Sequence, residues 1–273
     1  MKNMPFKLRD IDETQAPLLD HLIELRTRLL RCVVALGIAF AVCLYFAEDI
    51  FGFLARPLTK AFPTGEGRLI YTKLYEAFFV EIKVALFAAF FVSFPIIANQ
   101  LWAFVAPGLY AREKKAFLPF LVATPVLFTM GAALAYFVVM PTAFHWFLGF
   151  EGSRGGLKLE ALPGTGDYLD LVMQFILAFG ISFLLPVLLM LLNRAGIVTR
   201  AQMAGARRYV IVGIFIVAAV ITPPDVISQL LLATPLLILF EGSLALMWFS
   251  EKRARTQAER EQTQQKESGG NIG

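Results

Sequence analysis

Charge is scarce in this chain of 273 residues. Asp, Glu, Lys and Arg together make up 17% of it, whereas a soluble domain carries about 25%. Apolar residues make up 58%, against about 45–50% in soluble domains, and the mean hydropathy is +0.66. This composition excludes fibrous, disulfide-rich and disordered proteins and predicts a membrane protein. The pI of 9.1 would favour nucleic acid as a partner of a soluble domain, but membrane topology explains it better, and we predict no nucleic-acid binding.

Cysteine and histidine are nearly absent, with two residues of each. Cys32 and Cys43 lie in one apolar run about 16 Å apart along a helix, which is beyond the reach of a disulfide. His21 and His145 fall on opposite sides of the membrane in the topology that the basic residues predict. The sequence contains no phosphate-binding loop, HExxH pair, CxxC motif or GxSxG elbow. We therefore predict a protein that is not an enzyme and holds no cofactor or metal.

Six apolar runs are candidate membrane spans: 29–47, 84–106, 116–140, 168–192, 209–222 and 226–249. The first four are long enough to cross about 30 Å of hydrocarbon as helices. The fifth rises only about 21 Å, so it must either thin the bilayer locally or end inside it, and we expect spans five and six to form a short hairpin. The hairpin should turn at 222–225 (TPPD), because two consecutive prolines cannot continue a helix. The predicted fold class is an all-α membrane protein with six transmembrane helices.

The basic residues predict the orientation of these spans. Of the 25 Lys and Arg residues, 18 lie in 1–31, 107–116, 193–208 and 250–273, and 7 lie in the segments on the other side. Acidic residues are divided almost evenly between the two sides. The positive-inside rule, which concerns Lys and Arg alone, therefore places both termini in the cytoplasm.

The chain divides into a cytoplasmic N-terminal segment (1–28), a six-helix transmembrane domain (29–249) and a cytoplasmic tail (250–273). Leucines at 18, 22, 25 and 29 share one face, which predicts an interfacial helix ahead of the first span. The first apolar run follows a polar segment and lacks an A-x-A site, so we expect an uncleaved anchor. The tail is rich in Gln, Glu and Arg and ends in Gly, which predicts disorder.

Two carboxylates adjoin the predicted cytoplasmic surface. Glu24 precedes Arg28 by four residues, so the simplest interpretation is an ion pair on a membrane-surface helix. Glu113 lies among three basic residues of a short turn, where it could merely offset their repulsion. The alternative is that both carboxylates receive a pair of guanidinium groups, because Arg binds carboxylate bidentately and each charged hydrogen bond contributes about 1.5–3 kcal/mol.

Polar residues within the spans are few, and Glu241 stands out among them. A carboxylate in hydrocarbon costs several kcal/mol unless it is paired or solvated, so Glu241 is a functional candidate by default. The simpler interpretation is that it supports helix packing near the cytoplasmic side. Prolines within four of the spans predict kinked helices and a curved wall rather than a tight bundle. These prolines are Pro95, Pro119, Pro125, Pro186 and Pro235.

Three stretches of sequence resemble the TatC family, the multi-span subunit of the twin-arginine protein translocase. They are 21–29 (HLIELRTRL), 100–110 (QLWAFVAPGLY) followed by Glu113, and 222–229 (TPPDVISQ). All three occur in the right order within the predicted six-span topology, and the resemblance extends from about Leu18 to Trp248.

The resemblance implies a receptor and core subunit that binds twin-arginine signal peptides at the cytoplasmic face and helps export folded proteins, using the proton-motive force. It also implies a location in the bacterial inner membrane. The implied partners are TatA-like and TatB-like single-span proteins, the signal peptides of folded precursors, the lipid bilayer, and further copies of the chain in a multi-copy complex.

The resemblance also assigns roles to single residues. Glu24 and Glu113 match the positions that receive the two arginines of the signal, and Arg26 and Phe104 lie close to that site. The positions linked to structure or translocation are an outer-loop proline (Pro57), an outer aromatic residue (Phe78), and a polar pair on spans five and six (Asp225 and Gln229). Glu241 joins this group as a carboxylate within a span and not through the resemblance.

One position departs from the family pattern. TatC proteins usually carry an acidic residue midway along span four, in a motif like Phe-Glu-x-Pro, whereas this chain reads FLLP at 183–186. Leu184 cannot ionise. Any function of that carboxylate must here be performed by Gln174, by Glu241 or by no residue.

Two other classes of function remain as alternatives. A secondary transporter of small solutes often shows an internal repeat around a midplane ion site, and no convincing repeat occurs here. An intramembrane enzyme would need a nucleophile and a base at one depth, for which His145 and Ser182 would be the residues to test.

Overall fold

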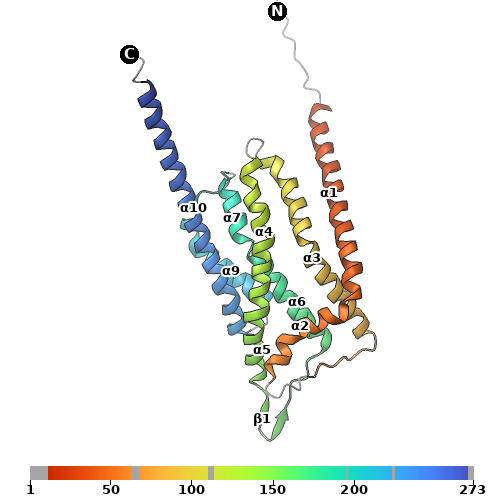
Figure 1. The fold of residues 1–273 in the computed structure, drawn as a ribbon. Helices are drawn as coiled ribbons and strands as arrows, with labels where there is room; N and C mark the ends of the chain where they lie inside the picture. Colours follow the sequence, from red (N-terminus) through yellow and green to blue (C-terminus); the bar gives the residue numbers. More distant parts are fainter. Residues whose placement is uncertain (1–11, 63–67, 110–113, 195, 223–224, 270–273) are drawn as a thin grey trace, which may run out of the picture. The chain divides into compact units, whose positions relative to one another are not determined.

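The computed structural model of the chain describes residues 12–62, 68–109, 114–194, 196–222 and 225–269. Two compact units occur within it, namely Met1–Phe51 with Glu81–Leu121, and Gly52–Val80 with Val122–Gly273. The helices are α1 (Asp12–Tyr45), α2 (Ala47–Ala61), α3 (Glu76–Leu109), α4 (Lys114–Leu134), the π-helix η1 (Ala135–Val139), α5 (Met140–Leu148), α6 (Thr165–Ser182), α7 (Leu185–Arg194), α8 (Arg200–Gly205), α9 (Arg207–Ile221) and α10 (Val226–Gly269) (Figure 1).

Five helical segments of the described residues are long and apolar enough to cross a membrane. They are Leu22–Tyr45, Glu76–Phe104, Phe120–Leu148, Thr165–Arg194 and Val226–Phe249. The remaining apolar run forms α9, which has 15 residues and is too short to cross about 30 Å at 1.5 Å per residue. The all-α class and the short fifth helix are thus confirmed.

The first unit contains an antiparallel pair of helices, α1 and α3. Their contact is made by small buried residues, with Ala39 and Cys43 of α1 facing Ala85 and Ala89 of α3, and Ala47, the first residue of α2, belongs to the same cluster. Lipid tails are as apolar as these side chains, so helices in a membrane associate mainly where small residues let the backbones approach closely. The sequence places such residues at intervals of four on both helices, which keeps them on one face.

In the second unit, glycines allow α4 and α6 to approach each other closely. A Cβ placed on Gly131 of α4 would lie 2.4 Å from the backbone oxygen of Phe179 in α6. A Cβ on Gly180 would lie 2.7 Å from the ring of Phe128. Both phenylalanines are essentially fully buried. The core of this unit therefore depends on the absence of a side chain at two positions.

Prolines and a π-helix interrupt two of the spans. Span three continues from α4 through the five-residue η1 into α5, and Pro141 lies in the first turn of α5. Span four breaks at Phe183 and Leu184, just before Pro186 in the first turn of α7. Proline lacks an N–H and clashes with the carbonyl four residues earlier, which explains the break. The kink predicted at Pro186 thus coincides with a break in span four. Helices α3, α4 and α10 continue past their prolines, and the kinks predicted at Pro95, Pro119, Pro125 and Pro235 stay predictions.

Two helices are longer than the sequence predicts. Helix α1 runs without interruption from Asp12 into the first span, so the expected boundary between an interfacial helix and the span at 28–29 is absent. Helix α10 continues to Gly269, so the prediction of disorder from 250 onwards is wrong for residues 250–269. Glu, Lys, Arg, Gln and Ala favour the helix, and extending an existing helix avoids the cost of nucleation.

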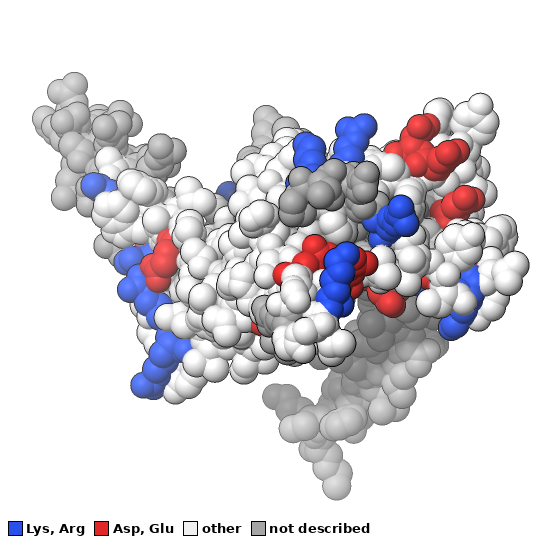
Figure 2. All heavy atoms as spheres, turned by 90° about the horizontal axis from the view of Figure 1, so that it is seen from below, with Lys and Arg blue, Asp and Glu red and all other residues white. Residues whose placement is uncertain are grey.

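The loop between spans three and four contains a β-hairpin, which the apolar runs and motifs of the sequence do not predict. Strands β1 (Gly152–Arg154) and β2 (Leu157–Leu159) pair antiparallel. Gly155 and Gly156 form the turn with φ of 59° and 82°, the left-handed values that a two-residue hairpin turn requires. Figure 2 looks at the molecule from this end and shows Lys and Arg side chains lying next to Asp and Glu side chains.

Candidate functional site

The candidate receptor site begins with Glu24 on α1. Arg28 donates to its Oε1 from Nε at 2.9 Å and from Nη2 at 2.5 Å, one helical turn away. Both side chains are partly shielded, with 36% of Glu24 and 20% of Arg28 exposed. The predicted i,i+4 ion pair is confirmed. The same geometry indicates that the carboxylate of Glu24 can accept a guanidinium from two nitrogens at once.

Phe104 lies at the same height as Glu24 along the antiparallel pair. Ala39 and Ala89 belong to one cluster, and Glu24 precedes Ala39 by as many residues as Phe104 follows Ala89. At 1.5 Å per residue, each is about 22 Å from the cluster, towards the same end of the pair. Phe104 is half-buried and Arg26 is exposed.

Glu113 lies outside the described residues, so the predicted proximity of the two carboxylates stays a prediction.

Gln100 is a further polar residue of this region, and the sequence singles it out only as one of a few polar residues in the spans. It lies one turn before Phe104 on α3, so the two share a face. Its Oε1 is buried and has no hydrogen-bond partner among the described residues. An unsatisfied buried acceptor is costly, which makes Gln100 a candidate to accept a hydrogen bond from a ligand. The sequence alone cannot show that this oxygen is unpaired, because its possible hydrogen-bond partners come from other helical turns.

Pro57 does not lie in a loop, as the resemblance implies, but inside helix α2. Because proline has no N–H, the carbonyl of Phe53 four residues earlier loses its helical donor. The hydroxyl of Tyr136, from η1, donates to that carbonyl at 2.6 Å, and the rings of Tyr136 and Phe53 stack with centroids 4.4 Å apart. Tyr168 of α6 donates in the same way to the carbonyl of Leu54 at 2.7 Å. Pro57 therefore opens an acceptor through which span three holds α2, and Tyr168 adds a second contact from span four.

Replacing Tyr136 by Phe keeps the stacked ring and leaves the Phe53 carbonyl without a donor. We expect Tyr136→Phe to lower the free energy of unfolding by about 1–3 kcal/mol, the cost of an unsatisfied buried acceptor. Unfolding of the purified protein in detergent measures it. In a Pro57→Ala background residue 57 again has an N–H for this carbonyl, so the same substitution should cost much less there. Equal costs in the two backgrounds would contradict the role given to Pro57.

Phe78 lies in the first turn of α3, where its ring is 62% exposed and contacts Phe79 edge to face. Glu76, two residues earlier, fixes this end of the helix. Its Oε1 accepts from the backbone N–H of Gly166 at 2.9 Å, and its Oε2 accepts from that of Thr72 at 3.0 Å. The start of α6 carries unsatisfied N–H groups and a partial positive charge, so a carboxylate is favourable there. No motif or local pattern in the sequence marks Glu76 as a contact between these helices.

Asp225 and Gln229 hold the turn between α9 and α10. Asp225 accepts from the backbone N–H of Ser228 at 2.6 Å and so caps α10, while Gln229 donates to the carbonyl of Phe215 at 3.2 Å. Gln174 of α6 donates to the carbonyl of Ile221 at 2.8 Å, one of the carbonyls that a helix leaves unpaired at its end. Residues 223–224, the predicted double-proline turn, lie outside the described part of the chain.

Glu241 pairs with Arg207, the first residue of α9, at 2.9 Å. The side chains are 53% and 52% exposed respectively, so the pair lies on the surface of its unit. This geometry favours the simpler of the two interpretations, in which Glu241 supports helix packing. No local pattern indicates Arg207 as the partner, because 34 residues separate it from Glu241.

We expect Glu241→Gln to change stability little, because exposed ion pairs contribute about 0–1 kcal/mol and Arg207 can extend towards the membrane surface. Unfolding in detergent should show a loss below about 1 kcal/mol, and export of a folded reporter should be retained. A large loss of export at unchanged stability would instead assign Glu241 a part in translocation.

Leu184, at the position where the family usually has an acid, lies in the break between α6 and α7 and is half-buried. Of the two residues suggested as substitutes for that acid, Gln174 binds the end of α9 and Glu241 binds Arg207. Both make a structural contact. Among the described residues no group of three or more His, Cys, Asp or Glu side chains could hold a metal ion.

Residues 20–235 match the family model described as Sec-independent protein translocase protein (TatC). A relative from Magnetococcus marinus, named Sec-independent protein translocase protein TatC, is 47% identical over 249 residues, which cover 91% of this chain and 89% of the relative. The protein of the same name from Escherichia coli K12 is 40% identical over 249 residues, covering 91% of this chain and 94% of that protein.

Two solved structures share the fold. One, described as the crystal structure of the twin arginine translocase receptor TatC, superposes with a TM-score of 0.72 at 39% identity, covering 85% of this chain and 99% of the other. The second, the same receptor in the detergent DDM, gives a TM-score of 0.73 at 40% identity, covering 83% of this chain and 98% of the other.

Proposed function

This chain belongs to the TatC family of Sec-independent protein translocase proteins, and from that premise we propose that Glu24 and Glu113 receive the arginine pair of a signal peptide. The chain is a multi-pass membrane protein and a core subunit of the twin-arginine translocase, not an enzyme. The relatives are named as translocase proteins, so the alternative of a small-solute transporter has no support.

The observation that carries the proposal is the ion pair of Glu24. The carboxylate of Glu24 accepts two nitrogens of the Arg28 guanidinium, which is the bond that a signal arginine would make. Docking then exchanges one guanidinium for another, so the carboxylate of Glu24 stays paired while Arg28 is released. Glu113 is proposed as the acceptor of the second arginine, and Arg26 and Phe104 as the flanking residues.

The distribution of basic residues supports a cytoplasmic position for this site. We propose that both termini lie there and that the protein resides in the bacterial inner membrane, because 18 of the 25 Lys and Arg residues are on the side of the N-terminus. The apolar part of the signal would then enter the bilayer beside the helices whose ends carry Glu24 and Phe104.

The short hairpin of α9 and α10 is proposed as the thinned region for passage of the cargo. Helix α9 rises only about 22 Å. The bilayer around it must therefore become thinner, or other protein segments must cover the ends of the helix. TatA-like and TatB-like single-span proteins, working with several copies of this chain and the proton-motive force, are the proposed partners for passage.

Export of a folded reporter tests the proposed function in cells whose own subunit is replaced by this chain. Export should require a twin-arginine signal and fall more than tenfold in the Glu24→Gln/Glu113→Gln variant, because the signal loses both counterions. The matched control is Glu251→Gln, which removes a carboxylate of α10 that pairs with Arg200 of α8. Equal export by the double variant and the wild type, at equal amounts of protein in the membrane, would refute the receptor assignment.

A further inference from the structure

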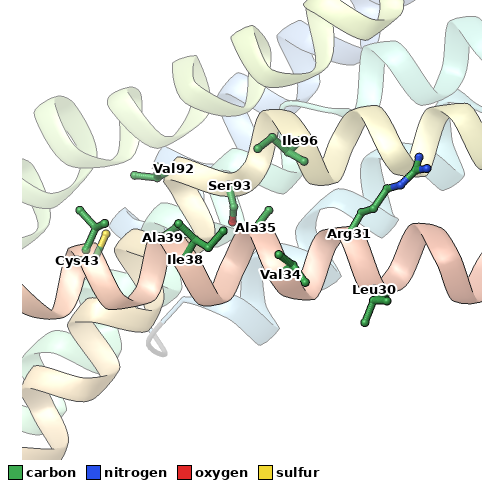
Figure 3. A pocket seen from close by; sticks show the side chains of 11 residues that line it. Leu30, Arg31, Val34, Ala35, Ile38, Ala39, Cys43, Val92, Ser93 and Ile96 are labelled. Atoms are coloured by element: carbon green, nitrogen blue, oxygen red, sulfur yellow. The ribbon is translucent and has the colours of Figure 1, made fainter.

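A groove runs along the first unit between α1 and α3. Its volume is about 610 Å³, and its lining is apolar apart from Arg31 and Ser93. Ser93 is buried and its hydroxyl already donates to the carbonyl of Ala89 at 2.6 Å. Arg31 is therefore the one polar side chain of the lining that can serve a ligand. In Figure 3 its guanidinium lies at one end of the groove, with Val92 and Cys43 towards the other end.

Arg31 has no ion pair or hydrogen bond with any side chain or backbone group that the structure describes, unlike Arg28 one turn earlier, which binds Glu24. It lies within the apolar span Leu22–Tyr45. Counting about 30 Å back from Tyr45 reaches Arg26, so Arg31 lies roughly 7 Å inside the hydrocarbon. A cation at this depth needs a counterion, and an arginine side chain is long enough to reach the membrane surface.

From these observations we propose that the groove binds one anionic phospholipid, with the phosphate on Arg31 and an acyl chain lying along the groove towards Cys43. The distance from Arg31 to Cys43 is about 18 Å along α1, close to the roughly 15 Å depth of one leaflet. Guanidinium and phosphate match in charge and in bidentate geometry. The cytoplasmic leaflet, to which the proposed topology assigns this end of α1, is the one that attracts basic residues near membrane spans.

The volume of the groove favours a lipid over a partner helix. A helix with a diameter of about 10 Å lying along 18 Å would occupy roughly 1,400 Å³, so it would rest on the groove instead of within it. The floor is formed in part by Ala35 and Ala39, whose small side chains leave room for a chain of methylene groups. Arg31 would also be left without a counterion by an apolar helix.

Native mass spectrometry of the purified full-length chain tests this proposal, with phosphatidylglycerol and phosphatidylcholine of identical acyl chains as probes. We expect the first phosphatidylglycerol to bind roughly fivefold more tightly than phosphatidylcholine, from one additional cation–anion contact. Arg31→Gln should remove this preference, and Arg31→Lys should keep most of it. Arg26→Gln is the matched control, because Arg26 is exposed on the same helix but does not line the groove.

A second variant separates the groove from the charge. Ala35→Phe fills the floor and leaves Arg31 in place, and we expect it to weaken the first binding event of both lipids. The proposal is overturned if Arg31→Gln leaves the preference intact, or if Arg26→Gln lowers it equally, because diffuse attraction would then explain it. It is also overturned if Arg31→Gln and Ala35→Phe leave lipid binding unchanged but weaken co-purification of a single-span partner. None of these results depends on signal-peptide binding, so they test the lipid site independently of the proposed receptor function.

Discussion

Replacing Glu24 and Glu113 together by Gln should weaken binding of a twin-arginine signal peptide roughly 100-fold. Each charged hydrogen bond contributes about 1.5–3 kcal/mol, and the lower end applies here because about a third of Glu24 is exposed to solvent. The loss of two such bonds therefore amounts to about 3 kcal/mol. Fluorescence anisotropy with a labelled peptide and the purified protein measures it, and each single variant should show about a tenfold loss.

Arg28 provides an internal check on this prediction. Arg28→Gln removes the resident guanidinium, so a signal arginine no longer has to displace it from Glu24. We expect this variant to bind the peptide as tightly as the wild type or more tightly. A twin-lysine peptide should bind more weakly to both proteins, because an ammonium group cannot form the two-nitrogen fork. Weaker binding by Arg28→Gln would show that Arg28, and not Glu24, contacts the signal.

Adding one methyl group at Gly131 should be among the most destabilising single changes in the second unit. Its Cβ would lie 2.4 Å from the oxygen and 2.8 Å from the carbon of the Phe179 carbonyl, and backbone in a helix cannot turn aside. Helices α4 and α6 would have to separate. We expect Gly131→Ala to lower the free energy of unfolding by about 3 kcal/mol, the upper part of the range for overpacking. Unfolding in detergent measures this loss.

Substitutions at two other glycines should show how the loss of stability depends on the space around the added methyl group. Gly180→Ala meets the ring of Phe128 at 2.7 Å, and because a side chain can shift, we expect a smaller loss of about 1–2 kcal/mol. Gly213→Ala in α9 meets nothing within 4 Å and should be neutral or slightly stabilising, since Ala favours a helix by about 1 kcal/mol over Gly. Equal losses at all three positions would contradict the close approach of α4 and α6.

The spans were predictable because their signal is local. An apolar run of sufficient length identifies a span whatever surrounds it, and even the shortness of α9 follows from counting. The pair of Glu24 and Arg28 was predictable for the same reason, since four residues separate the two. The hairpin turn at Gly155 and Gly156 is also local, and two adjacent glycines between short runs could have indicated it.

Contacts between distant residues could not be predicted in this way. The proline at 57 signals a missing donor, but nothing nearby in the chain indicates that Tyr136 supplies it. The pairing of Glu241 with Arg207 likewise depends on how α9 and α10 pack. The helical tail was missed for a different reason. Composition alone suggests disorder, whereas the end of α10 continues a helix that the membrane span has already nucleated.

A photoreactive phenylalanine derivative in place of Phe104 tests the central claim most directly. In native membranes containing a precursor with a twin-arginine signal, position 104 should cross-link to the signal beside its arginine pair. The same probe at Phe78, at the opposite end of α3, should not cross-link there. The cross-link should disappear with a twin-lysine signal and in the Glu24→Gln/Glu113→Gln variant. A cross-link from position 104 that persists without either carboxylate, or one from position 78 to the arginine region, would contradict docking at this end of the helices.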